Sequence, residues 1–324
     1  MPGIFNITYN NNIVIKELNK TNIYANKISN SIKNPKEFIK YKNALINSNK
    51  LHLIGKNIGQ AINIEDNGNY SMYFVKGYNL MDLLSKNHYL CKKSGWISKE
   101  LKLEKNLCKK ILSCLIYLEL DLKKFSKTDE LSGDWFLHNL IYSEEKNEII
   151  NVDLEGFYTY NGNSPMCDLK KYIPEQLNAC KDVLINEINS HIFSIILWNP
   201  IQKYSSEIID YISKQHSIIY NKNHTIDNIE KFIYKIYELD VRCHKPYLPK
   251  KIEYLKKYKN SINFILVLVD NPNYDNQNVS RTADNLKKKI RSNYKSYITD
   301  YLRDVIIHIS DNSVEAENIY RFIL

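Results

Sequence analysis

The sequence predicts an α+β protein with a β-rich beginning, a helical middle and a small α/β unit at the C-terminal end. Apolar and polar residues alternate in 4–9 and 13–18, and apolar residues recur at helical spacing within 99–125. An unbroken apolar run then returns at 264–269, as in a buried strand. The chain has 324 residues, of which 44% are hydrophobic, so it is long enough for a substantial core.

We divide the chain into residues 1–78, 79–245 and 246–324. The first part begins with a predicted β-hairpin, whose turn contains Asn10, Asn11 and Asn12. Asn34 and Pro35 then suit the N-cap and first turn of a helix from about Lys36 to Asn47. The apolar face expected for this helix consists of Phe38, Ile39, Tyr41 and Leu45. Short strands are expected near 51–54, 60–64 and 70–75.

The second part contains a short helix in KGYNLMDLL and a long amphipathic helix within 99–125. A loop follows, and two short strands at 140–143 and 149–152 flank a turn. From 166 to about 242 the pattern predicts mostly helix. The segment HKPYLPKK, with two prolines, marks the boundary to the third part. In this last unit we expect a strand at 262–269, a basic helix at about 280–297, a strand at 304–309 and a helix from Ser313.

Composition excludes several classes of protein. Lysine and arginine exceed aspartate and glutamate by 45 to 36, a formal net charge of +9, but no nucleic-acid-binding motif is present. A nucleic-acid partner is therefore not expected. No apolar stretch approaches the roughly 18 residues of a membrane span, and no signal peptide is evident, so we expect a cytoplasmic protein. The six cysteines form no CxxC pair, which indicates neither a zinc site nor a disulfide framework.

The segment 133–155 carries the residues that suggest chemistry. Asp134 and Asn139 lie on one loop, and Asp153 follows the predicted hairpin. Phosphoryl transfer from ATP requires a carboxylate that accepts the proton of the attacking hydroxyl group, and oxygen ligands for the metal ions that bridge the phosphates. A hairpin between the loop and Asp153 would bring these groups to the same edge.

The motif SGDWFLHN, a strand and then DLEG resembles the catalytic loop and the metal-binding element of the protein-kinase-like superfamily. The likeness is to its small-molecule branch of aminoglycoside, choline and lipopolysaccharide sugar kinases. This resemblance implies a two-lobed fold with a β-rich N-lobe and a helical C-lobe, with ATP and Mg²⁺ as cofactors. It further implies that Asp134 is the catalytic base, that Asn139 and Asp153 are metal ligands, and that Glu155 is a second acid.

Other segments follow the order of the same superfamily. Lys16, on the second strand, resembles the lysine that contacts the α and β phosphates, and Glu37 is its candidate ion-pair partner. Tyr73, Phe74 and Val75 occupy the place of the hinge, whose backbone contacts adenine. Asp168 resembles the acid that supports the catalytic loop from below. The implied acceptor is a small molecule or glycan, because the segment between Asp153 and Asp168 is short for a peptide kinase.

The residues of this motif are also compatible with other interpretations. Asp and Asn favour turns, so the Asp134, Asn139 and Asp153 set is also compatible with two Asx-rich turns. Ser132 replaces the usual histidine of the family, and no Gly-rich loop precedes Lys16. A pseudokinase or scaffold module, for example in surface-glycan assembly, is therefore the second hypothesis. His138 could orient substrate or simply cap the loop.

The C-terminal segment VIIHISDNSVEAENIYRFIL resembles the end of nucleoside diphosphate kinases. In that resemblance His308 would be the phosphorylated histidine, and Arg281 and Arg291 would contact phosphate. A histidine at the end of a buried strand is otherwise a hydrogen-bonded residue of the core. The basic helix around Lys287 is either a solvated face or an anion-binding patch.

Overall fold

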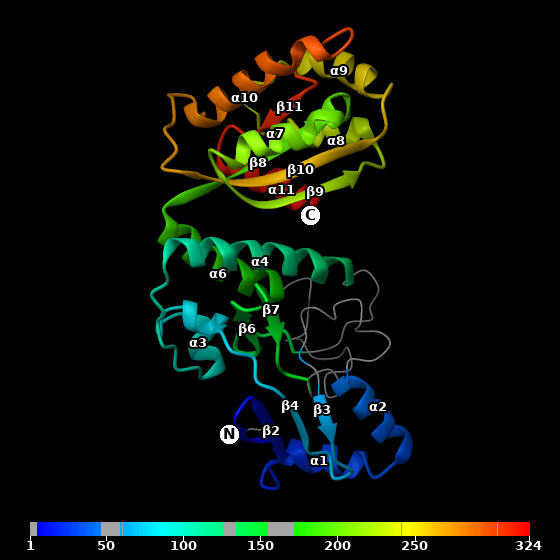
Figure 1. The fold of residues 1–324 in the computed structure, drawn as a ribbon, viewed down its shortest axis with the longest axis vertical. Coiled ribbons are helices and arrows are strands. Elements are labelled where there is room, and N and C mark those ends of the chain that lie inside the picture. The colour runs from blue at the N-terminus through cyan, green and yellow to red at the C-terminus, as the bar shows by residue number, and fades with distance from the viewer. Residues whose placement is uncertain are drawn as a thin grey trace. The chain divides into compact units, whose positions relative to one another are not determined.

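The computed structural model describes residues 5–46, 59, 61–125, 134–154, 172–240, 242–302 and 304–324. The chain forms two compact units, Met1–Leu184 and Ile185–Leu324 (Figure 1). The N-terminal unit contains two antiparallel sheets and the C-terminal unit one, each accompanied by helices. The predicted α+β class is thereby confirmed. Among the described residues, no helix combines the length and the apolar character needed to cross a bilayer.

The first sheet of the N-terminal unit has the order β1-β2-β4-β3. Its strands are β1 (Phe5–Asn10), β2 (Ile13–Leu18), β3 (Ala61–Ile64) and β4 (Tyr70–Tyr73). The predicted hairpin is confirmed, with Asn10 opposite Ile13 in the register. Asn11 has a φ of 54°, a left-handed conformation that asparagine tolerates better than most residues.

Two helices accompany this sheet, α1 (Ile23–Ser31) and α2 (Pro35–Ile46). The predicted start of α2 is confirmed, because the Asn34 side-chain oxygen accepts the Lys36 N–H at 2.9 Å. Tyr41 and Leu45 are fully buried, as expected, whereas Ile39 is 57% exposed and does not belong to the buried face. The Tyr41 hydroxyl donates to the Gly68 carbonyl at 2.6 Å, which ties α2 to the turn between β3 and β4.

The second sheet has the order β5-β6-β7 and consists of β5 (Tyr78–Asn79), β6 (Leu140–Ser143) and β7 (Glu148–Asn151). The predicted hairpin of β6 and β7 is confirmed. The predicted helix in KGYNLMDLL is instead β5 followed by a 3-10 turn, Leu80–Leu83. Gly77 leads into β5 with no room for a side chain, since a Cβ there would lie 1.9 Å from the Tyr142 carbonyl oxygen.

The described part of the N-terminal unit also contains α3 (Tyr89–Ser94), α4 (Lys105–Phe125) and most of α6 (Tyr172–Ile188), whose last residues belong to the C-terminal unit. The long helix predicted within 99–125 is therefore confirmed as α4. Helices α4 and α6 lie alongside each other by the β6–β7 hairpin (Figure 1), and a buried ion pair of 2.8 Å joins Glu119 to Lys181. Because both side chains are nearly inaccessible, each charge depends on the other for solvation.

The C-terminal unit is built on one antiparallel sheet of order β11-β8-β10-β9. Its elements are β8 (Ser190–Trp198), α7 (Ser205–Ser213), β9 (Ser217–Thr225), α8 (Ile229–Ile236), α9 (Leu248–Leu255), β10 (Ser261–Asp270), α10 (Arg281–Tyr294), β11 (Ile307–Ile309) and α11 (Ser313–Ile323). Along the chain, the elements from β8 to β11 follow the order of the ferredoxin-like β-α-β-β-α-β unit, with α8 and α9 inserted between β9 and β10. Helix α11 packs against β8 and α10 against β11.

The predicted boundary at 245/246 is wrong, because β8 and β9 belong to the same sheet as β10 and β11. The structure places the division at 184/185. Residues 166–242 were expected to be mostly helical, yet they contain these two strands. Most of β8 is buried, so its apolar run has no alternation, and periodicity cannot distinguish such a strand from a buried helix. The strand expected at 262–269 and the helix from Ser313 are confirmed as β10 and α11. The strand expected at 304–309 is the shorter β11, which begins at Ile307.

Candidate functional site

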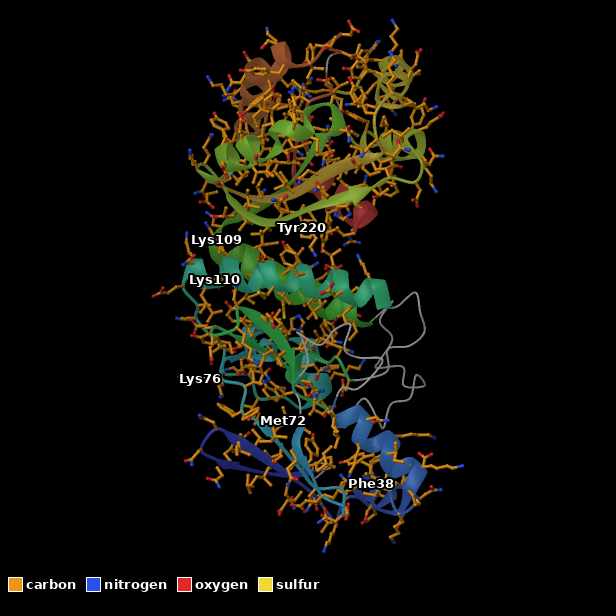
Figure 2. The ribbon with its side chains drawn as sticks, turned by 45° about the vertical axis from the view of Figure 1, so that its right-hand side comes forward. Phe38, Met72, Lys76, Lys109, Lys110 and Tyr220 are labelled. Carbon is orange, nitrogen blue, oxygen red and sulfur yellow. The ribbon has the colours of Figure 1, made fainter. Side chains whose placement is uncertain are left out.

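A cavity of about 580 Å³ lies in the N-terminal unit between the first sheet and the β6–β7 hairpin. Met72, one of its lining residues, lies on β4, and Lys76 lies on the stretch that follows β4 (Figure 2). The cavity brings together residues predicted from separate segments: Lys16, Tyr73, Phe74, Val75, Asp134, Asn139 and Asp153. Apolar and aromatic side chains supply most of the other walls, among them Phe5, Ile7, Tyr9, Val14 and Trp96.

The loop that carries Asp134 is fixed by its own hydrogen bonds. One carboxylate oxygen of Asp134, Oδ1, accepts the Phe136 N–H at 3.0 Å, which leaves Oδ2 for a substrate group. The Leu137 N–H donates to the side-chain oxygen of Gln176 on α6 at 3.2 Å. The Asn139 N–H donates to the Phe136 carbonyl at 2.8 Å. The loop is thus held in one shape from within and from α6.

Asn139 presents its amide in a defined orientation. Its Nδ2 lies 3.4 Å from the Asp134 carbonyl oxygen, so Oδ1 is the atom of this amide that can ligate a cation. Its carbonyl oxygen accepts the Val152 N–H at 2.9 Å, next to Asp153. Asn139 and Asp153 both line the cavity, and both are partly exposed there. A carboxylate and an amide oxygen are ligands that Mg²⁺ favours.

Lys16 is the buried cation of this site, with 7% of its surface exposed. Its ammonium group donates to the Val152 carbonyl at 3.2 Å, and so lies against the segment that carries Asp153. The rings of Phe5 and Tyr70 lie near the same ammonium group, at 6.0 and 5.4 Å from their centroids. Lys16 therefore connects β2 to the end of the β6–β7 hairpin.

The segment 73–75 forms one wall of the cavity. The Phe74 N–H donates to the Asn12 carbonyl at 2.7 Å, so this amide is already used by the turn between β1 and β2. The Tyr9 and Phe74 rings meet edge to face, with centroids 5.8 Å apart. A planar ligand entering here would meet an aromatic rim.

His138 and Trp96 form a second wall. The sequence drew attention to His138 but gave no indication of Trp96. The Trp96 indole N–H donates to the buried Asp82 carboxylate at 2.8 Å, which fixes its ring. That ring is nearly parallel to the His138 imidazole, with centroids 6.0 Å apart and an angle of 20°. Burial lowers the pKa of His138, against the opposing effect of the nearby Asp134 carboxylate. The lowered pKa favours the neutral imidazole at pH 7.

Of the three remaining predicted residues, the structure describes Glu37 alone. Glu37 lies on α2, forms an ion pair with Lys40 and is not among the lining residues. Glu155 and Asp168 lie outside the described residues. Gln176 on α6 is 2% exposed, and its side-chain oxygen accepts the Leu137 N–H of the Asp134 loop.

A second cluster of ionisable residues lies in the C-terminal unit around His308. The His308 ring is 1% exposed, and its Nε2 lies 3.1 Å from Oε1 of Glu315. Asp311 binds Lys287 Nζ at 3.0 Å and Arg242 Nη2 at 2.6 Å. Burial lowers the pKa of His308 and raises the pKa of Glu315. This environment agrees with the interpretation of His308 as a hydrogen-bonded core residue.

Three other basic residues of this unit have different surroundings. Lys251 is 1% exposed, and its ammonium group lies 4.4 Å from the Trp198 ring centroid and 4.7 Å from that of Tyr237. Arg291 donates to the Ile307 carbonyl at 3.0 Å and pairs with Asp304. Arg281 is exposed at the start of α10. Ligand atoms of Asp240, His308 and Glu315 lie close enough together to hold one metal ion. The Lys287 ammonium group, 3.0 Å from Asp311, already places positive charge near them.

No protein-family model matches the chain, and no curated protein matches it. Among solved structures, the chain is similar to an orthorhombic crystal form of the Aquifex aeolicus nucleoside diphosphate kinase. The identity is 14% and the TM-score 0.30, over 42% of this chain and 95% of that chain. At this TM-score we draw nothing from the likeness about the fold or the function of this chain.

Proposed function

We propose that the N-terminal unit is an ATP- and Mg²⁺-dependent phosphotransferase with a protein-kinase-like fold, acting on a hydroxyl group of a small molecule, sugar or glycan. The observation that supports this most is the shared cavity. Lys16, Asp134, Asn139 and Asp153 come from β2, the loop before β6 and the segment after β7, yet all four line it. The sheet order β1-β2-β4-β3, with the lysine on β2 and the aromatic segment after β4, supports the same proposal.

The residues present suit a nucleotide and its metal. Asp153 and the Oδ1 atom of Asn139 would hold Mg²⁺, which neutralises charge on the phosphates when it is bound. Lys16 would pair with phosphate oxygens, and the aromatic rim at Tyr9 and Phe74 would contact the base.

In this proposal Asp134 is the proton acceptor. Its Oδ2 atom takes the proton of the acceptor hydroxyl as that oxygen forms a bond to the γ-phosphorus and the bond to the β-phosphate oxygen breaks, releasing ADP. The hydrogen bond from the Phe136 N–H fixes the carboxylate, so no reorientation is required when the hydroxyl arrives.

The test is ADP release with MgATP and an acceptor mixture of glucose, glucosamine, ribitol and choline. We expect Asp134→Asn to lower transfer at least about 100-fold, while calorimetry finds ATP affinity unchanged. Asp153→Asn should remove the Mg²⁺-dependent part of ATP binding. Full transfer by either variant would contradict the assignment.

A nucleotide-free scaffold is the alternative, and one observation favours it. The turn between β1 and β2 contains asparagines in place of glycines, and its Asn12 carbonyl already engages the Phe74 N–H. Backbone amides approach phosphate less closely from such a turn than from glycine. Thermal denaturation with millimolar ATP and Mg²⁺ distinguishes the two, because a scaffold without a nucleotide site would show no stabilisation.

A further inference from the structure

Asn151 lies between the two parts of the proposed phosphotransferase site. It is the last residue of β7, pairs with Leu140 in the register and has no exposed surface. Leu140 directly follows the Asp134 loop, and Asp153 follows Asn151 by two positions. The side chain of Asn151 is therefore enclosed where the loop enters the hairpin and the Asp153 segment leaves it.

Both the nitrogen and the oxygen of the Asn151 side-chain amide form hydrogen bonds. Its Nδ2 donates to the Asp134 carbonyl oxygen at 2.9 Å, across 17 positions of sequence. Its Oδ1 accepts the Asp153 N–H at 2.9 Å. An ionised carboxylate of the same shape could not make both bonds, because it has acceptors alone.

The backbone around Asn151 adds further connections. The Asn151 carbonyl accepts the Gly59 N–H at 2.9 Å, and the next residue, Val152, accepts from the Lys16 ammonium group at 3.2 Å. The Val152 N–H donates to Asn139 at 2.9 Å. The segment 151–153 thus contacts every polar part of the cavity that the proposed function uses.

We propose that Asn151 is a positioning residue that sets the separation between the Asp134 base and the Asp153 metal ligand. The proposal rests on the phosphotransferase function, because this separation matters only if both carboxylates act on one pair of substrates. A small displacement of either carboxylate would lower the rate more than it lowers substrate binding. The bond to the Asp134 carbonyl is the part specific to this role, since the bond to Asp153 is local.

The decisive variant is Asn151→Asp, which keeps the shape and the acceptor but loses the Nδ2 donor. We expect kcat with MgATP and the acceptor mixture to fall about 10- to 100-fold, with KM for ATP within about twofold. Hydrogen exchange should accelerate at the Phe136, Leu137 and Asn139 amides. Asn151→Ala, which loses both bonds, should lower kcat further.

The matched control is Asn263→Asp in the C-terminal unit. Asn263 is also a buried strand asparagine, and its Nδ2 donates to Asn223 at 3.1 Å. This change should leave kcat and exchange in 134–139 unaltered. In the wild-type protein, the Asn151 Nδ2 protons should give slowly exchanging NMR signals, which tests the bond without any variant.

The outcomes separate this inference from the function on which it rests. If the wild type neither transfers phosphate nor binds MgATP, the phosphotransferase proposal fails, and the inference about catalytic positioning fails with it, whatever the exchange data show. If the wild type is active, unchanged exchange at 134–139 or a kcat within about twofold in Asn151→Asp overturns the positioning role alone. Equal acceleration of exchange throughout the unit would also overturn it, as general destabilisation.

Discussion

In the N-terminal unit, Asp134, Asn139 and Asp153 are partly exposed and line a cavity of about 580 Å³. In the C-terminal unit, the comparable cluster is enclosed: His308 and Glu315 are each 1% exposed and Asp311 2%. There the charges of Asp311 and Lys287 satisfy each other within the unit. The first cluster turns polar atoms toward a cavity that a ligand can fill, and no residue of the second cluster lines that cavity. The two clusters therefore differ in whether their polar side chains border a cavity or pair with one another.

Of the changes that test this difference between the two clusters, Asp311→Asn should have the largest effect on stability. Although burial raises the pKa of this carboxyl, hydrogen bonds and charge from Arg242 and Lys287 hold it below its ordinary value. Asp311→Asn leaves the Lys287 charge buried beside a neutral group. We expect the free energy of unfolding of the C-terminal unit to fall by about 3–5 kcal/mol. Urea denaturation followed by Trp198 fluorescence measures it, in a background with phenylalanine at the other two tryptophans.

Asp284→Asn is the control for this change, because Asp284 also pairs with Arg242 but is more exposed. Its loss should cost less than about 1 kcal/mol. Equal effects of the two variants would contradict the view that enclosure of the charge determines its contribution.

Lys251 provides a test by pH. Burial lowers the pKa of this lysine to about 7. Between pH 7 and 9 the unfolded chain then carries a proton on Lys251 that the folded unit lacks, so the free energy of unfolding rises with pH. The slope from this group is at most about 1.4 kcal/mol per pH unit. Lys251→Met should flatten the profile in that range, and an unchanged slope would show that Lys251 is protonated when folded.

Lys16, which lines the cavity, and Glu37, which does not, should differ in their effect on ATP binding. Lys16→Ala removes the buried ammonium group next to Val152 and should weaken ATP binding about tenfold or more. Glu37→Ala removes an ion pair with Lys40 outside the cavity and should change ATP affinity less than twofold. Calorimetric titration of both variants decides whether the glutamate takes part. A large effect at Glu37 would restore the pairing expected from the sequence.

The smallest expected effect is that of Asp134→Asn on stability. Asp134 is partly exposed, and its Oδ1 bond to the Phe136 N–H can be kept by an asparagine oxygen. We expect the free energy of unfolding of the N-terminal unit to change by less than about 0.5 kcal/mol. Thermal and urea denaturation would show it, and a loss of several kcal/mol would assign Asp134 to the fold and not to a reaction.

Local patterns predicted the parts of the fold that depend on neighbouring residues. The hairpin around Asn10–Asn12, the cap at Asn34 and the hairpin before Asp153 all follow from turn residues and alternation. The sequence could not reveal that β8 joins the last sheet, because its apolar run has no period. Nor could it find β9, whose exposed second half, NKNHT, resembles a loop.

In the candidate site, too, local features were predicted and contacts between distant residues were not. The spacing of Asp134, Asn139 and Asp153 was sufficient to predict that they lie together, because one hairpin separates them. Asn151 and Gln176 were missed, since each acts through a bond to a distant backbone group, and a buried amide has no sequence pattern of its own. Trp96 was missed because it lies in the segment after α3, outside every motif that the sequence offered.

The lack of space for a side chain at Gly77 affects how variants of this protein should be interpreted. A side chain there would have to displace the Tyr142 carbonyl, and Tyr142 lies on the strand that immediately follows the Asp134 loop. A substitution at this glycine would therefore distort the loop although the glycine lies outside the cavity lining. Inactive variants recovered by random mutagenesis should accordingly include Gly77, and their defect should be assigned to backbone crowding and not to a lost ligand contact.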